Sequence, residues 1–243
     1  MISPIEPFGL LLIGGAFVAS TISGALGLGG GPLLLAVLGS FMPILTVIPL
    51  HAALMLGATT TRCWLFRSHV HWPITKPFMC GAVFGALLGA KVYLSLPENF
   101  VAGAMGTLML ASAWTPTLNW RPTQRRPFFI IGIVQAFLST LFGFGALIQS
   151  LILHTGLGRL QITGTLAVCF TALTLFKLLG FLVLGFAFDP YLWIVCLALI
   201  ATVIGSWCGK LLADRISEPQ FRTAFRFVIT IGALRLLYRA FAG

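Results

Sequence analysis

The sequence predicts an all-α integral membrane protein. Hydrophobic residues make up 58% of the 243 residues and charged residues only 8%, whereas a soluble domain carries about 25% charged residues. A chain of this size cannot bury so much apolar side chain within itself, so the surplus has to face lipid. About eight apolar segments divide the chain, and a bilayer-spanning helix needs roughly 20 such residues. Their ranges are 8–38, 43–66, 73–95, 99–115, 128–154, 162–188, 191–213 and 221–241.

The first segment, 8–38, is interrupted in its middle by the stretch SGALGLGGGPLLL (23–35). The helix-breaking residues are Gly27, Gly29, Gly30, Gly31 and Pro32. Irregular backbone at membrane depth persists only where it is buried in protein or lines a wet cavity. We therefore predict a half-helix, a glycine turn and a second half-helix that starts near Pro32. The N-terminus of that half-helix would offer free N–H groups to an anion, with a glycine-rich helix contact as the alternative.

The next segments, 43–66, 73–95 and 99–115, complete the first half of the chain, and the first of them holds several polar candidates. Arg62 is a candidate anion ligand, with snorkelling to the interface as the alternative. Thr59 and Thr60 could line the same path with hydroxyl groups, although threonines in membrane helices often bond their own backbone. His51 is either a proton-sensitive gate or an interfacial residue at a helix end.

The chain is predicted to consist of two transmembrane repeats, 1–115 and 128–243, joined by a basic polar linker, 116–127. The same glycine pattern recurs in the same order in both halves. GLGG at 27–30 aligns with GFGA at 143–146, Ser23 with Ser139, and GALLG at 85–89 with GSWCG at 205–209. An ordered series of this kind indicates an internal repeat, an arrangement that many secondary transporters share.

The glycine break also bears on whether the repeats are parallel or inverted. If the broken segment enters and leaves on one side of the membrane, the two halves have opposite orientations. Cytoplasmic loops carry an excess of Lys and Arg, but this rule separates the two arrangements only weakly. The inverted arrangement leaves Arg235 and Arg239 outside, whereas the parallel one places Arg159, Arg215 and Arg222 there. We favour inversion because it also explains the break.

The second half carries a degraded copy of the break. Its first segment, 128–154, keeps Gly143 and Gly145, whereas three apolar residues replace the last two glycines and the proline. Gln149 follows and could supply a side-chain donor, and Ser139 could supply a hydroxyl group. A backbone site and a simple glycine contact are both open for this copy.

Lys177 lies near the middle of segment 162–188, too deep for easy snorkelling. In the repeat alignment it falls beside Arg62, so each half places one cation at nearly the same position. We therefore expect the two cations to meet near the pseudo-twofold axis. No carboxylate lies within either apolar segment to neutralise them, and this combination favours an anionic ligand.

Two further glycine series predict close helix packing. They are Gly81, Gly85 and Gly89 in segment 73–95, and Gly205 and Gly209 in segment 191–213. Small residues at this spacing let two membrane helices approach closely. The contact could form within one chain or between the two copies of a homodimer.

The sequence argues against several other classes of protein. The net charge of +10 would suggest nucleic acid in a soluble protein, but the basic residues stand in short breaks between apolar runs, as the positive-inside rule describes. We find no nucleophile–base arrangement, no paired carboxylates and no cluster of metal-ligating side chains. We therefore expect no enzyme, no cofactor, no metal and no nucleic-acid partner.

The sequence resembles the sulfite exporter TauE/SafE family of membrane transporters over nearly its whole length. In the first half the resemblance is carried by SGALGLGGGP (23–32) and LHAALMLGATTTRCWLFRSHVHW (50–72). In the second half it is carried by STLFGFGA (139–146), TGTLAV (163–168), LFKLLGF (175–181) and GFAFDPYLW (185–193). The resemblance implies a multi-pass carrier of the bacterial inner membrane for sulfite, sulfonates, sulfoacetate or other small organic anions. The second copy departs from the family, which often shows another Gly-Gly-Gly there.

We therefore expect a secondary transporter for a small anion, with an anion channel and a membrane-embedded scaffold as the alternatives. The expected partners are the anion and the lipid bilayer. The expected binding residues are Ser23, Gly27, Gly29, Gly30, Gly31, Pro32, Thr59, Thr60, Arg62, Ser139, Gly143, Gly145, Gln149 and Lys177, with His51 as the possible gate.

Overall fold

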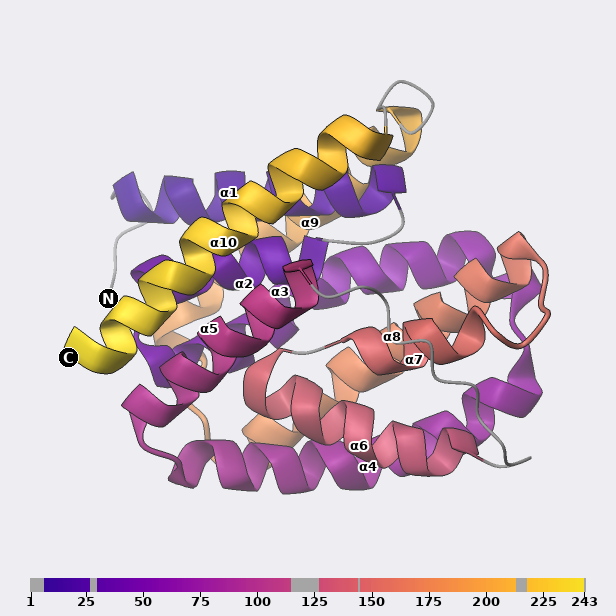
Figure 1. Cartoon of the computed structure of the whole chain (residues 1–243), viewed down its shortest axis with the longest axis horizontal. Helices are drawn as coiled ribbons and strands as arrows, with labels where there is room; N and C mark the ends of the chain where they lie inside the picture. The colour runs from indigo at the N-terminus through magenta and orange to yellow at the C-terminus, as the bar shows by residue number, and fades with distance from the viewer. Residues whose placement is uncertain (1–6, 27–29, 115–126, 144, 213–217, 243) are drawn as a thin grey trace.

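The computed structural model describes residues 7–26, 30–114, 127–143, 145–212 and 218–242, and within these ranges it contains helices and no strand (Figure 1). The helices are α1 (Pro7–Leu26), α2 (Gly30–Phe41), α3 (Ile44–Phe66), α4 (Trp72–Ser95), α5 (Glu98–Trp114), α6 (Pro127–Phe142), α7 (Ala146–Ile152), α8 (Arg159–Val183), α9 (Leu192–Leu212) and α10 (Glu218–Ala242). Two 3₁₀ turns, η1 (Arg67–His69) and η2 (Asp189–Tyr191), precede α4 and α9. The all-helical prediction is confirmed for the described residues.

Four described stretches are long and apolar enough to cross a membrane. They are Ile44–His69, Trp72–Ser95, Arg159–Val183 and Asp189–Leu212. Shorter apolar helices cover Gly9–Ile22, Gly30–Phe41 and Phe128–Phe142. Large apolar side chains stand exposed on the outer faces of the long helices, among them Val183 and Leu211. Such surfaces suit lipid and not water.

The first apolar segment is divided between two helices. α1 ends at Leu26, and α2 begins at Gly30, slightly before the predicted start near Pro32. Pro32 lies in the first turn of α2, where its missing N–H removes no helix hydrogen bond. Gly27 and Gly29 lie outside the described residues, and so does the side chain of Ser23.

The second apolar break lies between α6 and α7, around Gly143. Gly143 has a φ of 73°, a left-handed conformation that glycine adopts without steric cost. A Cβ at this position would also lie 2.6 Å from Cδ2 of Leu35 in α2. The broken segments of the two halves therefore meet at Gly143 and Leu35.

Helices α3 and α8 pack against each other in opposite directions through the middle of the bundle. Phe66, the last residue of α3, has its carbonyl oxygen against Gly164, near the start of α8. Earlier in α3, His51 lies close enough to Lys177, late in α8, for the two side chains to interact electrostatically. The antiparallel pair is flanked by α4, which packs on α8, and by α9, which packs on α3.

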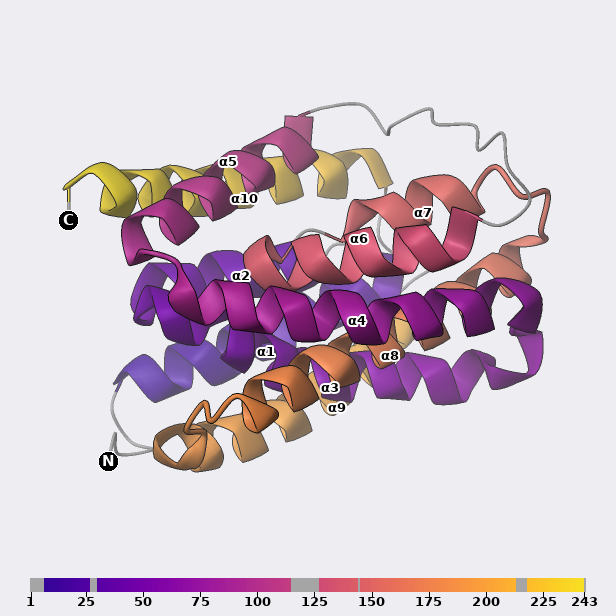
Figure 2. The ribbon, with the colours of Figure 1, turned by 90° about the horizontal axis from the view of Figure 1, so that it is seen from below.

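Each half packs its first helix against a helix of the other half, as Figure 2 shows for α4 and α6. The contact of α1 with α9 passes through Gly205 and Gly209, where Cβ atoms would collide with the backbone of Phe17 and Thr21. The contact of α4 with α6 is built in the same way. Gly81 and Gly85 of α4 lie against the carbonyl oxygens of Phe129 and Ile133, and Gly89 lies against Thr140. The predicted glycine faces are therefore used inside the chain.

Helices α5 and α10 form a second antiparallel pair at one side of the bundle (Figure 1). Trp114 Nε1 donates a hydrogen bond of 3.0 Å to Thr230 Oγ1 at one end of the pair. Helix α2 packs on α10, where Leu236 occupies the space beside Gly39. The short helix that follows the first break is thereby enclosed by protein.

Candidate functional site

Lys177 is buried in the helix bundle and has a defined hydrogen-bond partner. Only 2% of the residue is exposed, and its Nζ donates a hydrogen bond of 3.0 Å to Oγ of Ser139. Ser139 lies in α6, one turn before the break at Gly143, and is itself 4% exposed. Two candidates from the sequence are thus brought together. No described carboxylate forms an ion pair with Lys177, so the lysine has a neutral partner.

His51 links α3 to the start of α2. Its Nε2 lies 3.0 Å from the carbonyl oxygen of Gly31. Because a carbonyl oxygen can only accept, Nε2 carries the proton and donates. His51 lies about two turns inside α3, which begins at Ile44, and is 7% exposed. It is therefore not at the start of its helix, and the interfacial interpretation does not fit its burial.

The second ring nitrogen of His51 has no partner. Nδ1 is buried and forms no hydrogen bond, and in a neutral ring it is an acceptor because Nε2 holds the proton. Buried polar atoms in folded proteins are nearly always hydrogen-bonded. An unpaired Nδ1 close to the charge of Lys177 therefore marks a place where a ligand could supply the missing contact.

The first break offers backbone donors to the same region. Gly30 and Gly31 open α2, and no described side chain accepts a hydrogen bond from their N–H groups. A Cβ on Gly31 would lie 3.8 Å from Nε2 of His51, so the N-terminal turn of α2 approaches His51 closely. The first N–H groups of a helix have no partner within the helix and carry the positive end of its dipole. Pro32 lacks an N–H and contributes no donor.

The second break is arranged differently, because the side chain of Gln135 caps the first N–H groups of α7. The Oε1 atom of Gln135, in α6, accepts hydrogen bonds from the N–H groups of Leu147 and Ile148, at 2.9 and 3.2 Å. Gln135 is fully buried. Gln135 was not among the residues expected from the sequence, although a glutamine inside the apolar run FFIIGIVQAFL (128–138) is a visible signal. Gln149 was named in its place and forms no side-chain hydrogen bond among the described residues.

Arg62 is not brought to Lys177. It lies three turns beyond His51 along α3, a distance of about 16 Å at the helical rise of about 1.5 Å per residue. Because α3 and α8 run antiparallel, the direction from His51 to Arg62 leads away from Lys177 and towards the start of α8. The prediction that Arg62 and Lys177 lie close together therefore does not agree with the structure. In the repeat alignment the two residues occupy equivalent positions along α3 and α8. Because these helices pack antiparallel, equivalent positions lie at opposite ends of the pair.

The two threonines beside Arg62 have different surroundings. Thr59 donates through Oγ1 to the carbonyl oxygens of Met55 and Leu56, at 2.9 and 3.2 Å. Its hydroxyl is thus engaged with its own helix, as is common for threonine in membranes. Thr60 is exposed. Neither residue reaches the cluster formed by Lys177, Ser139 and His51.

Gly143 and Gly145 shape the second break, and the N–H group of Gly143 is already engaged. The Gly143 N–H donates to the carbonyl oxygen of Ser139 at 3.0 Å. Gly145 precedes α7, and a Cβ there would lie 3.8 Å from the ring of Phe170. Both glycines lie in the turn that connects α6, which carries Ser139, to α7.

Comparison with protein families identifies the class of protein. Residues 12–236 match the family described as Sulfite exporter TauE/SafE. The match spans nearly the whole chain, and the chain therefore belongs to this family of membrane transporters, as its resemblance predicted. Its members are transporters and not enzymes. No curated protein and no solved structure matched the chain.

Proposed function

We propose that this protein is a secondary transporter for a small sulfur-containing or organic anion, such as sulfite, a sulfonate or a sulfoacetate-like compound. The observation that carries the proposal is the buried Lys177, which faces Ser139 and His51 and has no described carboxylate partner. A charged side chain within the membrane costs roughly 2.5–3.5 kcal/mol on insertion scales. A bound anion would offset this cost and supply the negative charge that the chain does not provide.

The proposed site combines a cation from the second half with donors from the first. Lys177 binds one oxygen of the anion, and the N–H groups at the start of α2 bind another. The Ser139 hydroxyl adds a third contact. His51 Nδ1 accepts a hydrogen bond from an anion that carries a proton, such as hydrogen sulfite. Ser23, Gly27 and Gly29 stay predictions, because their contacts lie outside the described residues.

We further propose that 1–115 and 128–243 are inverted repeats joined by the linker 116–127. The crossed packing supports this, since α1 pairs with α9 as α6 pairs with α4. The directions of the helices support it as well. Phe17 and Thr21 of α1 meet Gly205 and Gly209 of α9 in the same order, so α1 runs parallel to α9. The equivalent helices α3 and α8 are antiparallel, as inversion requires.

The transport cycle then follows from the architecture. In transporters built from inverted repeats, alternating access arises when one unit rocks against the other around a site at the midplane. Lys177 and Ser139 belong to the second half, whereas His51 and Gly31 belong to the first. Motion between the halves would therefore open the site on one side while closing it on the other. We place the protein in the bacterial inner membrane, and a homodimer stays a prediction.

The test is counterflow in proteoliposomes. Vesicles loaded with unlabelled sulfite, a sulfonate or a carboxylate take up labelled sulfite, and wild type is compared with Lys177→Met. We expect saturable uptake that one internal anion stimulates, and loss of at least about tenfold in the variant, because removal of a buried charged partner costs more than 1.4 kcal/mol. Lys91→Met is the matched control, since Lys91 is exposed on α4.

The same vesicles separate the alternatives. Electrical current without stimulation by internal anion would indicate a channel. Absence of flux for every anion, from protein that is correctly folded, would favour a scaffold and overturn the proposal. Equal uptake by wild type and Lys177→Met would leave a carrier but remove Lys177 from its binding site.

A further inference from the structure

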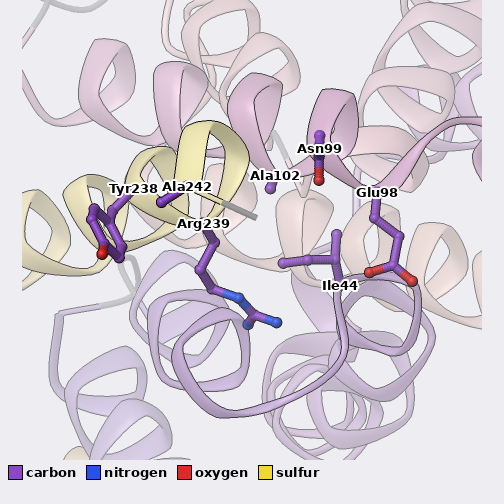
Figure 3. Close-up of a pocket in the computed structure, with 7 residues that line it drawn as sticks. All are labelled: Ile44, Glu98, Asn99, Ala102, Tyr238, Arg239 and Ala242. Carbon is purple, nitrogen blue, oxygen red and sulfur yellow. The ribbon is translucent and has the colours of Figure 1, made fainter.

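A polar cavity lies where the start of α3, the start of α5 and the end of α10 meet (Figure 3). Its volume is about 340 Å³. Ile44 forms part of its wall, and Glu98, Asn99, Tyr238 and Arg239 supply its polar groups. None of its lining residues belongs to the proposed transport site, and neither the family match nor the proposed function assigns it a role.

Arg239 is held in place by the backbone of another helix. Its Nη1 donates hydrogen bonds of 2.8 Å to the carbonyl oxygens of Gly39 and Met42 at the end of α2. Arginine has five N–H donors, and Nη1 carries two of them. The donors on Nη2 and Nε have no further partner among the described residues. A guanidinium group that is fixed on one side and open on the other is suited to bind a phosphate oxygen.

Glu98 supplies the opposite charge across the same cavity. It is the first residue of α5 and is exposed. Figure 3 shows the side chains of Glu98 and Arg239 extending in the same direction on either side of Ile44. No ion pair joins them, and neither has one with another described residue. Two opposite charges that line one cavity without pairing with each other favour a ligand that carries both charges.

The surroundings of the cavity point to a lipid. Tyr238 is 72% exposed and Phe241 is 89% exposed on α10, and Phe100 is exposed on α5. Tyrosine side chains such as Tyr238 gather where membrane helices meet the head-group layer. Helix α10 carries further exposed apolar side chains, among them Ile231 and Leu234, so acyl chains can lie along it. A water-soluble zwitterion would gain nothing from these exposed apolar surfaces.

We propose that this cavity binds the head group of a zwitterionic aminophospholipid. Arg239 binds the phosphate, the Glu98 carboxylate accepts hydrogen bonds from the primary ammonium group, and the acyl chains lie along the exposed apolar side chains of α10. Because Arg239 also bonds the end of α2, the lipid would be connected to the helix that follows the first break.

Native mass spectrometry of the full-length protein tests this binding. The detergent-solubilised protein is incubated with equal amounts of phosphatidylethanolamine, phosphatidylglycerol and phosphatidylcholine that carry the same acyl chains. We expect phosphatidylethanolamine to be retained in preference to both. Phosphatidylglycerol lacks the ammonium group, and the quaternary ammonium of phosphatidylcholine cannot donate an N–H bond to Glu98.

Variants in both charges make the test specific. Glu98→Gln should reduce the retained phosphatidylethanolamine about fivefold, the effect of losing roughly 1 kcal/mol of charge-assisted hydrogen bonding. Asp189→Asn is the matched control, because Asp189 is also exposed at the start of a helical element. Arg239→Gln should lose the lipid as well, whereas Arg235→Gln should not. Arg235 stacks over the ring of Phe41 and does not line the cavity.

Three outcomes would overturn the proposal. One is equal retention of the three lipids, and another is retention that Glu98→Gln leaves unchanged. The third is displacement of the lipid by free phosphoethanolamine at equal concentration, which would assign the cavity to a soluble zwitterion. Preference for phosphatidylethanolamine that depends on Glu98 and resists phosphoethanolamine would support it.

Discussion

The two helix breaks of this protein differ in how the N–H groups behind them are satisfied. In the second half, the amide oxygen of Gln135 accepts from Leu147 and Ile148 at the start of α7. In the repeat alignment, the residue equivalent to Gln135 is Ala19, a buried residue with no polar side chain. The N–H groups at the start of α7 are thus capped by a side chain from the same half. No described side chain caps the N–H groups at the start of α2.

This difference indicates that the two halves contribute different kinds of group to the proposed site. A helix start that is already capped has little to offer an anion, because its donors are engaged. The start of α2 keeps its donors and has His51 beside it. The second half supplies the cation instead, through Lys177 and its partner Ser139. The second half has therefore lost part of the glycine pattern, and in the proposed site it contributes a charged side chain where the first half contributes backbone donors.

The largest effect is expected where Gln135 is replaced. Gln135→Leu leaves the buried N–H group of Ile148 and the partly buried N–H group of Leu147 without an acceptor, and an unsatisfied buried group costs about 1–3 kcal/mol. We expect the free energy of unfolding to fall by roughly 2 kcal/mol or more, measured as thermal unfolding in detergent. Gln149→Leu is the matched control and should change it by less than about 0.5 kcal/mol. Equal effects of the two variants would contradict the capping role of Gln135.

A smaller change in stability is expected when a glycine of either break is replaced by alanine, and the two breaks should differ in its size. Gly143→Ala places a side chain on a left-handed residue and against Leu35, so it should destabilise the protein by about 1–2 kcal/mol. Gly31→Ala meets only ordinary contact with His51, at 3.8 Å, and should leave the stability nearly unchanged. Thermal unfolding of both variants measures the difference. A stable Gly143→Ala protein would show that the second turn tolerates another conformation.

The smallest change in stability is expected at His51. His51→Leu removes the donor to the Gly31 carbonyl, and the loss of one hydrogen bond costs about 1 kcal/mol. If His51 also contacts the anion, counterflow by the folded variant should fall about tenfold, in excess of the change in stability. Loss of stability together with normal counterflow would restrict His51 to supporting the start of α2.

Much of the fold could be predicted from local sequence. Each apolar range coincides with one helix or with a broken pair, because length and hydropathy alone decide whether a segment can be buried in a bilayer. The break before Pro32 was visible because glycine and proline act on their own backbone, wherever the helix lies. The membrane class and the family also followed from residues that stand close together in the chain.

The contacts between helices were decided only by the tertiary structure. Lys177 could be recognised as a buried charge, but its partner Ser139 lies on a different helix. Arg62 matched Lys177 in the alignment, yet antiparallel packing of α3 and α8 separates them. Gln135 reaches α7 only because the chain turns at Gly143. A sequence shows which side chains need a partner in lipid, whereas the direction and crossing of the helices determine which partner each side chain meets.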